Sequence, residues 1–329
     1  MGRVASDKSQ IVAELPLACS NEKAAVEFME RQRWGETPAC PRCGDTDVAQ
    51  VEDASGARSV RFLWRCHGCK RQFTVRIGTV FEDSRIPLHH WCYAFWAACG
   101  AKKGVSALQI KRQTGLTYKS ALFLLHRVRY AMAPARPARK LTGTVEVDET
   151  YVGGKAREMT RDQYLEWAAQ PAAKWGHRPK RARNEKPPVV ALVERGGEVR
   201  AQVVTDVTAA TLKGAIREYV DRSATINTDE ARQYIGIGRE FAGGHHAVKH
   251  SIGEYSRGDV TTNSVEGFFS LLKRGIFGTY HSVSKKHLHR YVSEFEFRYN
   301  TRRLDDGART AAAIRGAEGK RLRYQVPRS

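Results

Sequence analysis

The chain has 329 residues, of which 41% are hydrophobic, so it is long enough for two or three domains with sizeable cores. Its 55 Lys and Arg residues outnumber the 35 Asp and Glu residues, and the formal net charge of +20 indicates a polyanionic partner, most often nucleic acid; a surface made basic only for solubility is the alternative. No apolar run approaches the roughly 20 residues of a membrane span and the N-terminus lacks the apolar core of a signal peptide, which argues against a membrane or secreted protein.

The first predicted element is a short amphipathic helix over residues 22–33. Ala25, Phe28 and Met29 fall on one face of this helix, which predicts that the face is buried. We place the helix in an N-terminal helical segment.

Four of the seven cysteines form two CxxC pairs, Cys40 with Cys43 and Cys66 with Cys69, with 22 residues between the pairs. Thiolates at this spacing are typical of a four-cysteine zinc ribbon, so we predict one structural Zn²⁺ ion. Chance pairs or a redox motif are the alternatives, but a redox CxxC usually occurs once and opens a helix, whereas these pairs lie in Gly-containing turns. The cysteines do not form a secreted disulfide framework, which favours a cytosolic protein.

Three helices are predicted after the cysteines. Residues 88–100 are rich in aromatic side chains and predict a buried helix, and residues 105–113 and 117–132 predict two helices joined by a short turn. This is the helix-turn-helix pattern; an αα-hairpin that binds nothing is the alternative. The polar positions of the second helix that we expect to contact DNA are Tyr118, Lys119 and Arg127.

The stretch TVEVDETYVGG, residues 144–154, alternates apolar and acidic residues and ends in two glycines, which predicts a short strand followed by a turn. Aspartate is depleted in strands, and a carboxylate in a sheet is costly to bury without a cation or hydrogen bonds. Asp148 is therefore a candidate metal ligand. The alternative is an Asp at a strand end that makes local turn hydrogen bonds.

The elements after this strand predict a mixed α/β fold. Residues 188–194 and 198–204 predict a hairpin, residues 208–220 a helix, and residues 224–229 and 245–250 two further strands. The predicted order is β-β-β-α-β-α-β-α, which includes a helix between the fourth and fifth strands. This is the order of an RNase H-like fold, a mixed sheet with flanking helices.

Two more acids stand in similar positions. Asp229 ends the predicted fourth strand, with 80 residues between it and Asp148, and Glu266 lies on the final predicted helix, with 36 residues between it and Asp229. Lys273 follows Glu266 by two helical turns and Asn263 precedes it by one, so the three share a helix face. Three carboxylates in this arrangement predict a site for two Mg²⁺ ions, with Lys273 close to a phosphate.

A strongly basic stretch, residues 155–187, predicts an inserted loop. It follows the Asp148 strand directly, so we expect its cations to contact phosphates, with a solvated insertion as the alternative. The cations that we single out are Lys180, Arg181 and Arg183.

Taken in order, these motifs resemble the IS1595/ISXO2-like group of bacterial DDE transposases. The resemblance is carried by VEVDETYVGGK at residues 145–155, NTDE at 227–230, and the long stretch from TTNSVEG to RYNTR at 261–302, and it extends from about Ala24 to Leu304. It implies metal-dependent DNA cleavage at the ends of an insertion sequence and strand transfer into target DNA.

The resemblance also implies the site. Asp148, Asp229 and Glu266 would hold two Mg²⁺ or Mn²⁺ ions, and Lys273 would hold a phosphate. Some members of the group use Asn as the third metal-site residue, so Asn263 remains a candidate beside Glu266. The implied partners are double-stranded DNA, at the terminal inverted repeats and at the target, and further copies of the chain, with no membrane partner; the expected location is the bacterial cytoplasm, at the nucleoid.

Two alternatives remain, a structure-specific nuclease with the same metal core and a DNA-binding regulator derived from a transposase. The expected architecture is an RNase H-like α/β domain preceded by a zinc ribbon and a helix-turn-helix-like region. The predicted boundaries are 1–36 for the helical segment, 37–86 for the ribbon, 87–140 for the helix-turn-helix and linker, 141–305 for the catalytic domain with its insertion 155–187, and 306–329 for a basic tail.

Overall fold

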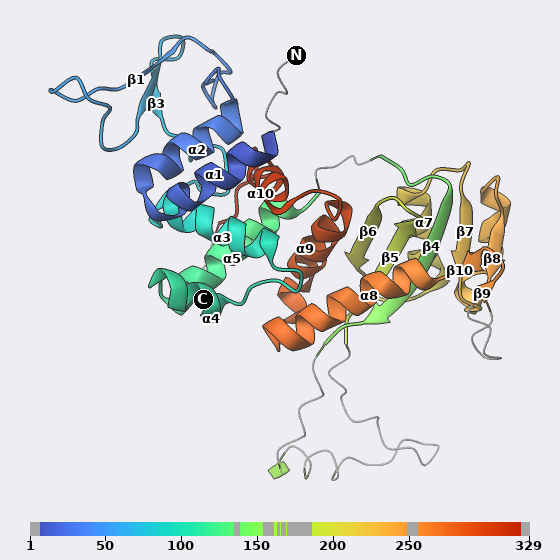
Figure 1. Ribbon diagram of the computed structural model, residues 1–329. Helices are drawn as coiled ribbons and strands as arrows, with labels where there is room; N and C mark the ends of the chain where they lie inside the picture. Colours follow the sequence, from blue (N-terminus) through green and yellow to red (C-terminus); the bar gives the residue numbers. More distant parts are fainter. Residues whose placement is uncertain are drawn as a thin grey trace. The chain divides into compact units, whose positions relative to one another are not determined.

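The chain divides into two compact units, residues 1–139 together with 290–329, and residues 140–289 (Figure 1). Each unit has a hydrophobic core of its own. Within the part of the chain that is described, every helix is too short or too polar to span a membrane. The computed structural model describes residues 7–134, 139–153, 161–162, 165, 169, 186–248 and 256–323.

The first unit is built on helices. The predicted helix over 22–33 is confirmed, and Asn21 caps it by accepting the N–H of Ala24 (3.0 Å). A preceding helix was not predicted from the sequence, because Pro16 lies inside it and its apolar residues follow no clear face. The helices of this unit are α1 (Asp7–Ser20), α2 (Glu22–Trp34), α3 (Leu88–Gly100), α4 (Ala107–Thr114), α5 (Tyr118–Met132), α9 (Leu288–Asn300) and α10 (Asp306–Arg315).

The pair α4 and α5 confirms the two helices and the short turn predicted over residues 105–132. Ser106 caps α4 by accepting the N–H of Gln109 (3.1 Å), and Thr117 caps α5 by accepting the N–H of Ser120 (3.2 Å). Between them Gly115 ends α4 at a φ of 72°, a left-handed conformation that glycine adopts without steric cost. The turn is therefore determined by its own residues.

A small antiparallel sheet follows α2 in the chain. Its strands are β1 (Val48–Gln50), β2 (Trp64–Cys66) and β3 (Gln72–Phe73), in the order β1-β2-β3. Its core contains only four buried residues, Cys40, Trp64, Cys66 and Phe73. So small a core is too little to hold the sheet by apolar burial alone.

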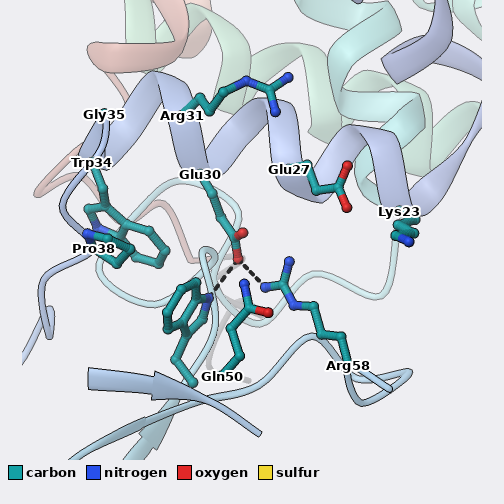
Figure 2. Close-up of a pocket in the computed structure, with 10 residues that line it drawn as sticks. Lys23, Glu27, Glu30, Arg31, Trp34, Gly35, Pro38, Gln50 and Arg58 are labelled. Atoms are coloured by element: carbon teal, nitrogen blue, oxygen red, sulfur yellow. Dashed lines mark hydrogen bonds and ion pairs between the residues drawn. The ribbon is translucent and has the colours of Figure 1, made fainter. Parts of the chain in front are cut away.

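The carboxylate of Glu30 joins α2 to this sheet, as Figure 2 shows. Glu30 is 8% exposed, and its Oε1 accepts hydrogen bonds from Trp64 Nε1 (2.7 Å) and from the guanidinium of Arg58 (2.5 Å). A cavity of about 350 Å³ lies beside these bonds, with Glu27 and Trp34 of α2 in its wall. The buried acid thus fixes the helix to the β2 side of the sheet.

The second unit contains a five-stranded mixed sheet in the order β6-β5-β4-β7-β8. β4 pairs antiparallel with β5 and parallel with β7, so the chain order across the sheet is 3-2-1-4-5. This confirms the predicted RNase H-like α/β fold. The strands are β4 (Thr144–Tyr151), β5 (Pro188–Glu194), β6 (Val199–Val203), β7 (Thr225–Thr228) and β8 (His245–Ala247).

Helices cover both faces of this sheet. On one face Val145 and Val147 of β4 pack with Leu212 and Ile216 of α7 (Ala209–Tyr219). On the other, α8 (Asn263–Gly275) crosses β4 and β5 (Figure 1) and buries its apolar stripe. Coverage on both sides explains why β5 is buried along its whole length.

The prediction of a helix between the fourth and fifth strands is wrong. The segment between β7 and β8 forms two short 3₁₀ turns, η1 (Arg232–Tyr234) and η2 (Ile237–Glu240). Gly236 separates the turns at a φ of 88°, which a continuing α-helix cannot contain. A small hairpin, β9 (Ser256–Arg257) and β10 (Val260–Thr261), then precedes α8, which is followed by the π-helical turn η4 (Ile276–Tyr280) and the 3₁₀ turn η5 (Lys285–His287).

Residues 290–305, which we assigned to the catalytic domain, lie in the first unit. A buried ionic contact within that unit connects them to α5. Glu294 of α9 pairs with Arg129 of α5 (2.6 Å) and with Arg298 one turn along α9 (2.6 Å). Charged groups at this depth require such partners, so α9 is tied to α5.

Candidate functional site

Two acids extend from neighbouring parallel strands at the same end of the sheet. Glu146 of β4 stands opposite Asn227 of β7 in the ladder. Asp148 lies two residues beyond Glu146, and Asp229 two residues beyond Asn227. Because the strands run in the same direction and side chains alternate with a period of two, both acids project from the same face of the sheet end.

The third acid, Glu266, lies in the first turn of α8, which packs on β4. Burial is the main cause that raises the pKa of Asp148 to about 7; the negative charges of Glu149, Asp229 and Glu266 also raise it, and a hydrogen bond from the N–H of Glu149 (2.8 Å) opposes the rise. The structure therefore brings the three sequence-predicted carboxylates within electrostatic reach of one another. A cluster of like charges of this kind favours a bound cation.

A fourth carboxylate, that of Glu149, was missed by sequence reasoning. It is half-buried, and the hydroxyl of Tyr234, which is fully buried, donates to its Oε2 (2.6 Å). Burial and the charge of Asp229 raise the pKa of Glu149. The only sequence signal was its position beside Asp148, and strand alternation places it on the opposite face.

Local hydrogen bonds orient the acids. Asp229 accepts the N–H of Ala231 (3.0 Å), and Glu266 accepts the hydroxyl of the buried Thr262 (3.0 Å). Hard carboxylate oxygens are the donors that Mg²⁺ and Mn²⁺ prefer, so the residues fit such ions by their chemistry. Among the described residues, the oxygens of these three acids do not all lie within 4.8 Å of one another, unlike the four CxxC sulfur atoms.

The other two predicted residues of the helix flank Glu266. Asn263 is the first residue of α8 and is exposed, and Lys273 is half-buried two turns after Glu266. At a rise of 1.5 Å per residue, Lys273 lies about 10 Å along the helix from Glu266. Lys273 therefore lies on the same side of α8 as Glu266 but two turns further along the helix.

The four CxxC cysteines form a second, separate cluster. Their sulfur atoms all lie within 4.8 Å of one another, with Cys40 Sγ 3.8 Å from Cys69 Sγ and Cys43 Sγ 3.6 Å from Cys66 Sγ. Four thiolates 2.3 Å from a tetrahedral zinc ion are separated by about 3.8 Å. The cluster therefore has the spacing of a structural zinc site.

The residues predicted to contact DNA differ in their exposure to solvent. Tyr118 and Lys119 are exposed in the first turn of α5. The prediction for Arg127 is wrong: its side chain is buried, and its guanidinium donates to the carbonyl oxygens of Val80 (2.9 Å) and Glu82 (3.0 Å). Helical periodicity identified it as polar, but it serves the fold. The three cations of the insertion, Lys180, Arg181 and Arg183, lie outside the described residues.

Comparison with known proteins finds two family matches. Residues 140–300 match the ISXO2-like transposase domain, and residues 20–72 match the transposase zinc-ribbon domain. A protein of Halobacterium salinarum, described as an uncharacterized protein in transposable element ISH50, is 29% identical over 290 residues, which cover 84% of this chain and 90% of that protein.

Among solved structures, a chain of the simian T-cell lymphotropic virus intasome in complex with PP2A regulatory subunit B56 gamma matches with 15% identity and a TM-score of 0.28. The match covers 57% of this chain and 63%, less than two thirds, of that chain. A likeness of this size says nothing about fold or function.

Proposed function

Because the chain belongs to the IS1595/ISXO2-like transposase family, we propose that it cuts DNA at the ends of an insertion sequence and joins the freed strand to target DNA. The observation that carries this proposal is the convergence of Asp148 of β4, Asp229 just after β7 and Glu266 of α8. The carboxylates carry excess negative charge that divalent cations would neutralise.

The chemistry needs no covalent intermediate on the protein. Two Mg²⁺ or Mn²⁺ ions held by Asp148, Asp229 and Glu266, with Asn263 as an alternative to Glu266, would activate a nucleophile and stabilise the leaving oxygen. Water attacks a phosphodiester at the element end and releases a 3′-hydroxyl, which then attacks a target phosphodiester and displaces another 3′-hydroxyl. Each joining step forms one phosphodiester and breaks one, so positioning and charge stabilisation suffice. Lys273 would contribute a positive charge toward a phosphate.

The first unit supplies DNA recognition in this proposal. The helix-turn-helix presents Tyr118 and Lys119 where such helices contact base edges, and the zinc ribbon presents a second surface. The insertion cations Lys180, Arg181 and Arg183 would contact phosphates without base selection. We propose double-stranded DNA as the partner, at inverted repeats and target, with two or more copies of the chain assembled on it.

Incubation with a labelled element end, a target duplex and Mg²⁺ tests this function. Joined product supports a transposase, whereas hydrolysis without joining supports a structure-specific nuclease with the same metal core. DNA binding with neither reaction would indicate a regulator derived from a transposase. The triple variant Asp148→Asn, Asp229→Asn, Glu266→Gln serves as the inactive control.

A further inference from the structure

Glu146 lies on β4 one side-chain period before Asp148, so both carboxylates leave the strand on the same face. Glu146 is fully buried, and its Oε2 accepts the backbone N–H groups of Ser264 (2.7 Å) and Val265 (3.2 Å). Its Oε1 accepts the hydroxyl of Ser264 (3.2 Å) and the guanidinium of Arg195 (3.0 and 3.2 Å). A strand residue 118 positions away in the sequence therefore caps the start of α8.

The residues before α8 cap its start only in part: the hydroxyl of Thr261 accepts the N–H of Asn263 (3.0 Å). Thr262, at the N-cap position, makes no side-chain capping bond, and its hydroxyl is used instead to hold Oε1 of Glu266 (3.0 Å). The first N–H groups of an α-helix need an acceptor, and a carboxylate there also meets the positive end of the helix dipole. Arg195, which is anchored on the carbonyl of Asp259 (2.8 Å), balances the buried charge of Glu146.

These contacts distinguish Glu146 from the acids beside it. Both of its oxygens are engaged, so it is not placed to bind a cation. Asp148 follows Glu146 by two residues, and Glu266 follows Ser264 by two residues. The hydrogen bonds between Glu146 and Ser264 therefore also fix how far Glu266 lies from Asp148. Sliding α8 along the strand would leave a buried carboxylate and two N–H groups unpaired, which is costly.

We propose that Glu146 is a positioning residue that aligns Glu266 with Asp148 for the binding of divalent cations. The inference rests on the metal site of the proposed function. Glu146 itself contacts neither the cations nor the DNA in this proposal. Groups that orient metal ligands typically change affinity by 10–100-fold when they are lost. We therefore expect Glu146→Gln to weaken divalent-ion binding by about tenfold or more, since an amide cannot accept from all four donors.

The test measures Mn²⁺ binding to the zinc-loaded, full-length protein without DNA, by electron paramagnetic resonance of free Mn²⁺. The matched control is Glu194→Gln. Glu194 is another buried carboxylate of the same sheet, and it accepts the backbone N–H of Thr142 (3.0 Å) and of Glu198 (3.3 Å). Both variants should lose stability on thermal unfolding, but only Glu146→Gln should lose Mn²⁺ affinity.

A folded Glu146→Gln protein that binds Mn²⁺ as tightly as wild type would overturn the inference. If that variant does not fold, Glu146→Asp keeps the charge and shortens the side chain by one methylene; weakened Mn²⁺ binding supports the inference, and wild-type affinity overturns it. Absence of Mn²⁺ binding to the wild-type protein would overturn the metal site of the proposed function itself. Titration of the wild-type protein with Mn²⁺ therefore distinguishes a failure of this inference from a failure of the proposed function.

Discussion

Asp148 carries a charge that the folded protein disfavours in the absence of a cation. Burial is the main cause, and three neighbouring carboxylates add to it. Strongly shifted pKa values cluster at functional sites. Here the buried acids lower the stability of the folded protein without a cation and favour the binding of one. Asp229 and Glu266 face the same space from other elements, so each is expected to be needed for catalysis.

We predict that Asp148→Asn, Asp229→Asn and Glu266→Gln each reduce strand cleavage by at least about a thousandfold, because each removes a metal ligand and its charge. Binding to an element end should change little, since these acids make no favourable contact with phosphate. Cleavage assays and band shifts on the same preparations check both statements. If a variant still cuts DNA near the wild-type rate, the substituted residue does not belong to the site. If Asn263→Ala reduces cleavage as severely as Glu266→Gln, both residues share the metal-binding role.

The free energy of unfolding should depend on pH, because the pKa of Asp148 is raised in the folded state. Its folded pKa of about 7 lies above the ordinary value of 3.8, so the folded state holds a proton that the unfolded state has released. Stability without cations should therefore fall as pH rises from about 4 to about 7 and then level off, by roughly 4 kcal/mol in total. Asp148→Asn should remove this loss.

Divalent cations bind the charged form, so Mg²⁺ should raise the melting temperature of wild type more at pH 8 than at pH 5. Melting curves at the two pH values, with and without Mg²⁺, measure the effect. Asp206→Asn is the matched control in the same unit, because Asp206 accepts hydrogen bonds from its neighbour Thr205 and from Thr208 and Thr211 at the start of α7. An equal Mg²⁺ shift in wild type and Asp148→Asn would contradict a cation site at Asp148.

At the scale of single elements, the cysteine cluster and its small sheet depend on each other. Only four residues make up the buried core there, two of them cysteines. A metal ion that bridges both CxxC turns would supply the folding free energy that apolar burial cannot. The family match over residues 20–72 agrees with this interpretation.

We expect one zinc ion per chain, and we expect Cys66→Ser to lose both the ion and the order of β1–β3. Elemental analysis of protein purified without chelator checks the first statement, and proteolysis between β1 and β2 checks the second. Cys92→Ser provides the control, because Cys92 is buried in the helical core and away from the cluster. Protein that contains no zinc yet resists proteolysis would show that the ribbon is not a metal site.

The elements show which features a sequence can reveal. Caps, turns and periodicity are local, so α2, α4, α5 and the β5–β6 hairpin were predicted correctly. The bond from Glu146 to Ser264 spans 118 residues, and no local pattern marks it. Arg127 fits a polar helix position, but its partners Val80 and Glu82 lie 47 and 45 residues earlier. Sequence reasoning therefore selected acids that the structure brings within electrostatic reach of Asp148 and missed the contacts that hold them.

For the whole molecule, the net charge of +20 should govern association with DNA. A protein that neutralises several phosphates releases the counterions bound to them, so its affinity falls steeply with salt. Base contacts add selectivity without adding to this slope. Salt dependence and sequence selectivity can thus be altered separately, by residues in different parts of the chain.

We predict that affinity for an element end falls by a factor of about 10³ or more between 50 and 200 mM salt, if six or more phosphates are contacted. Reversing the charges of Lys180, Arg181 and Arg183 should weaken binding to specific and random duplexes equally and reduce the salt slope. Lys119→Ala, in the exposed first turn of α5, should instead reduce the preference for element ends. Competition titrations with both duplexes at two salt concentrations measure all three effects. If Lys119→Ala lowers both affinities by the same factor, α5 contacts only phosphates, and recognition of the ends belongs to the zinc ribbon.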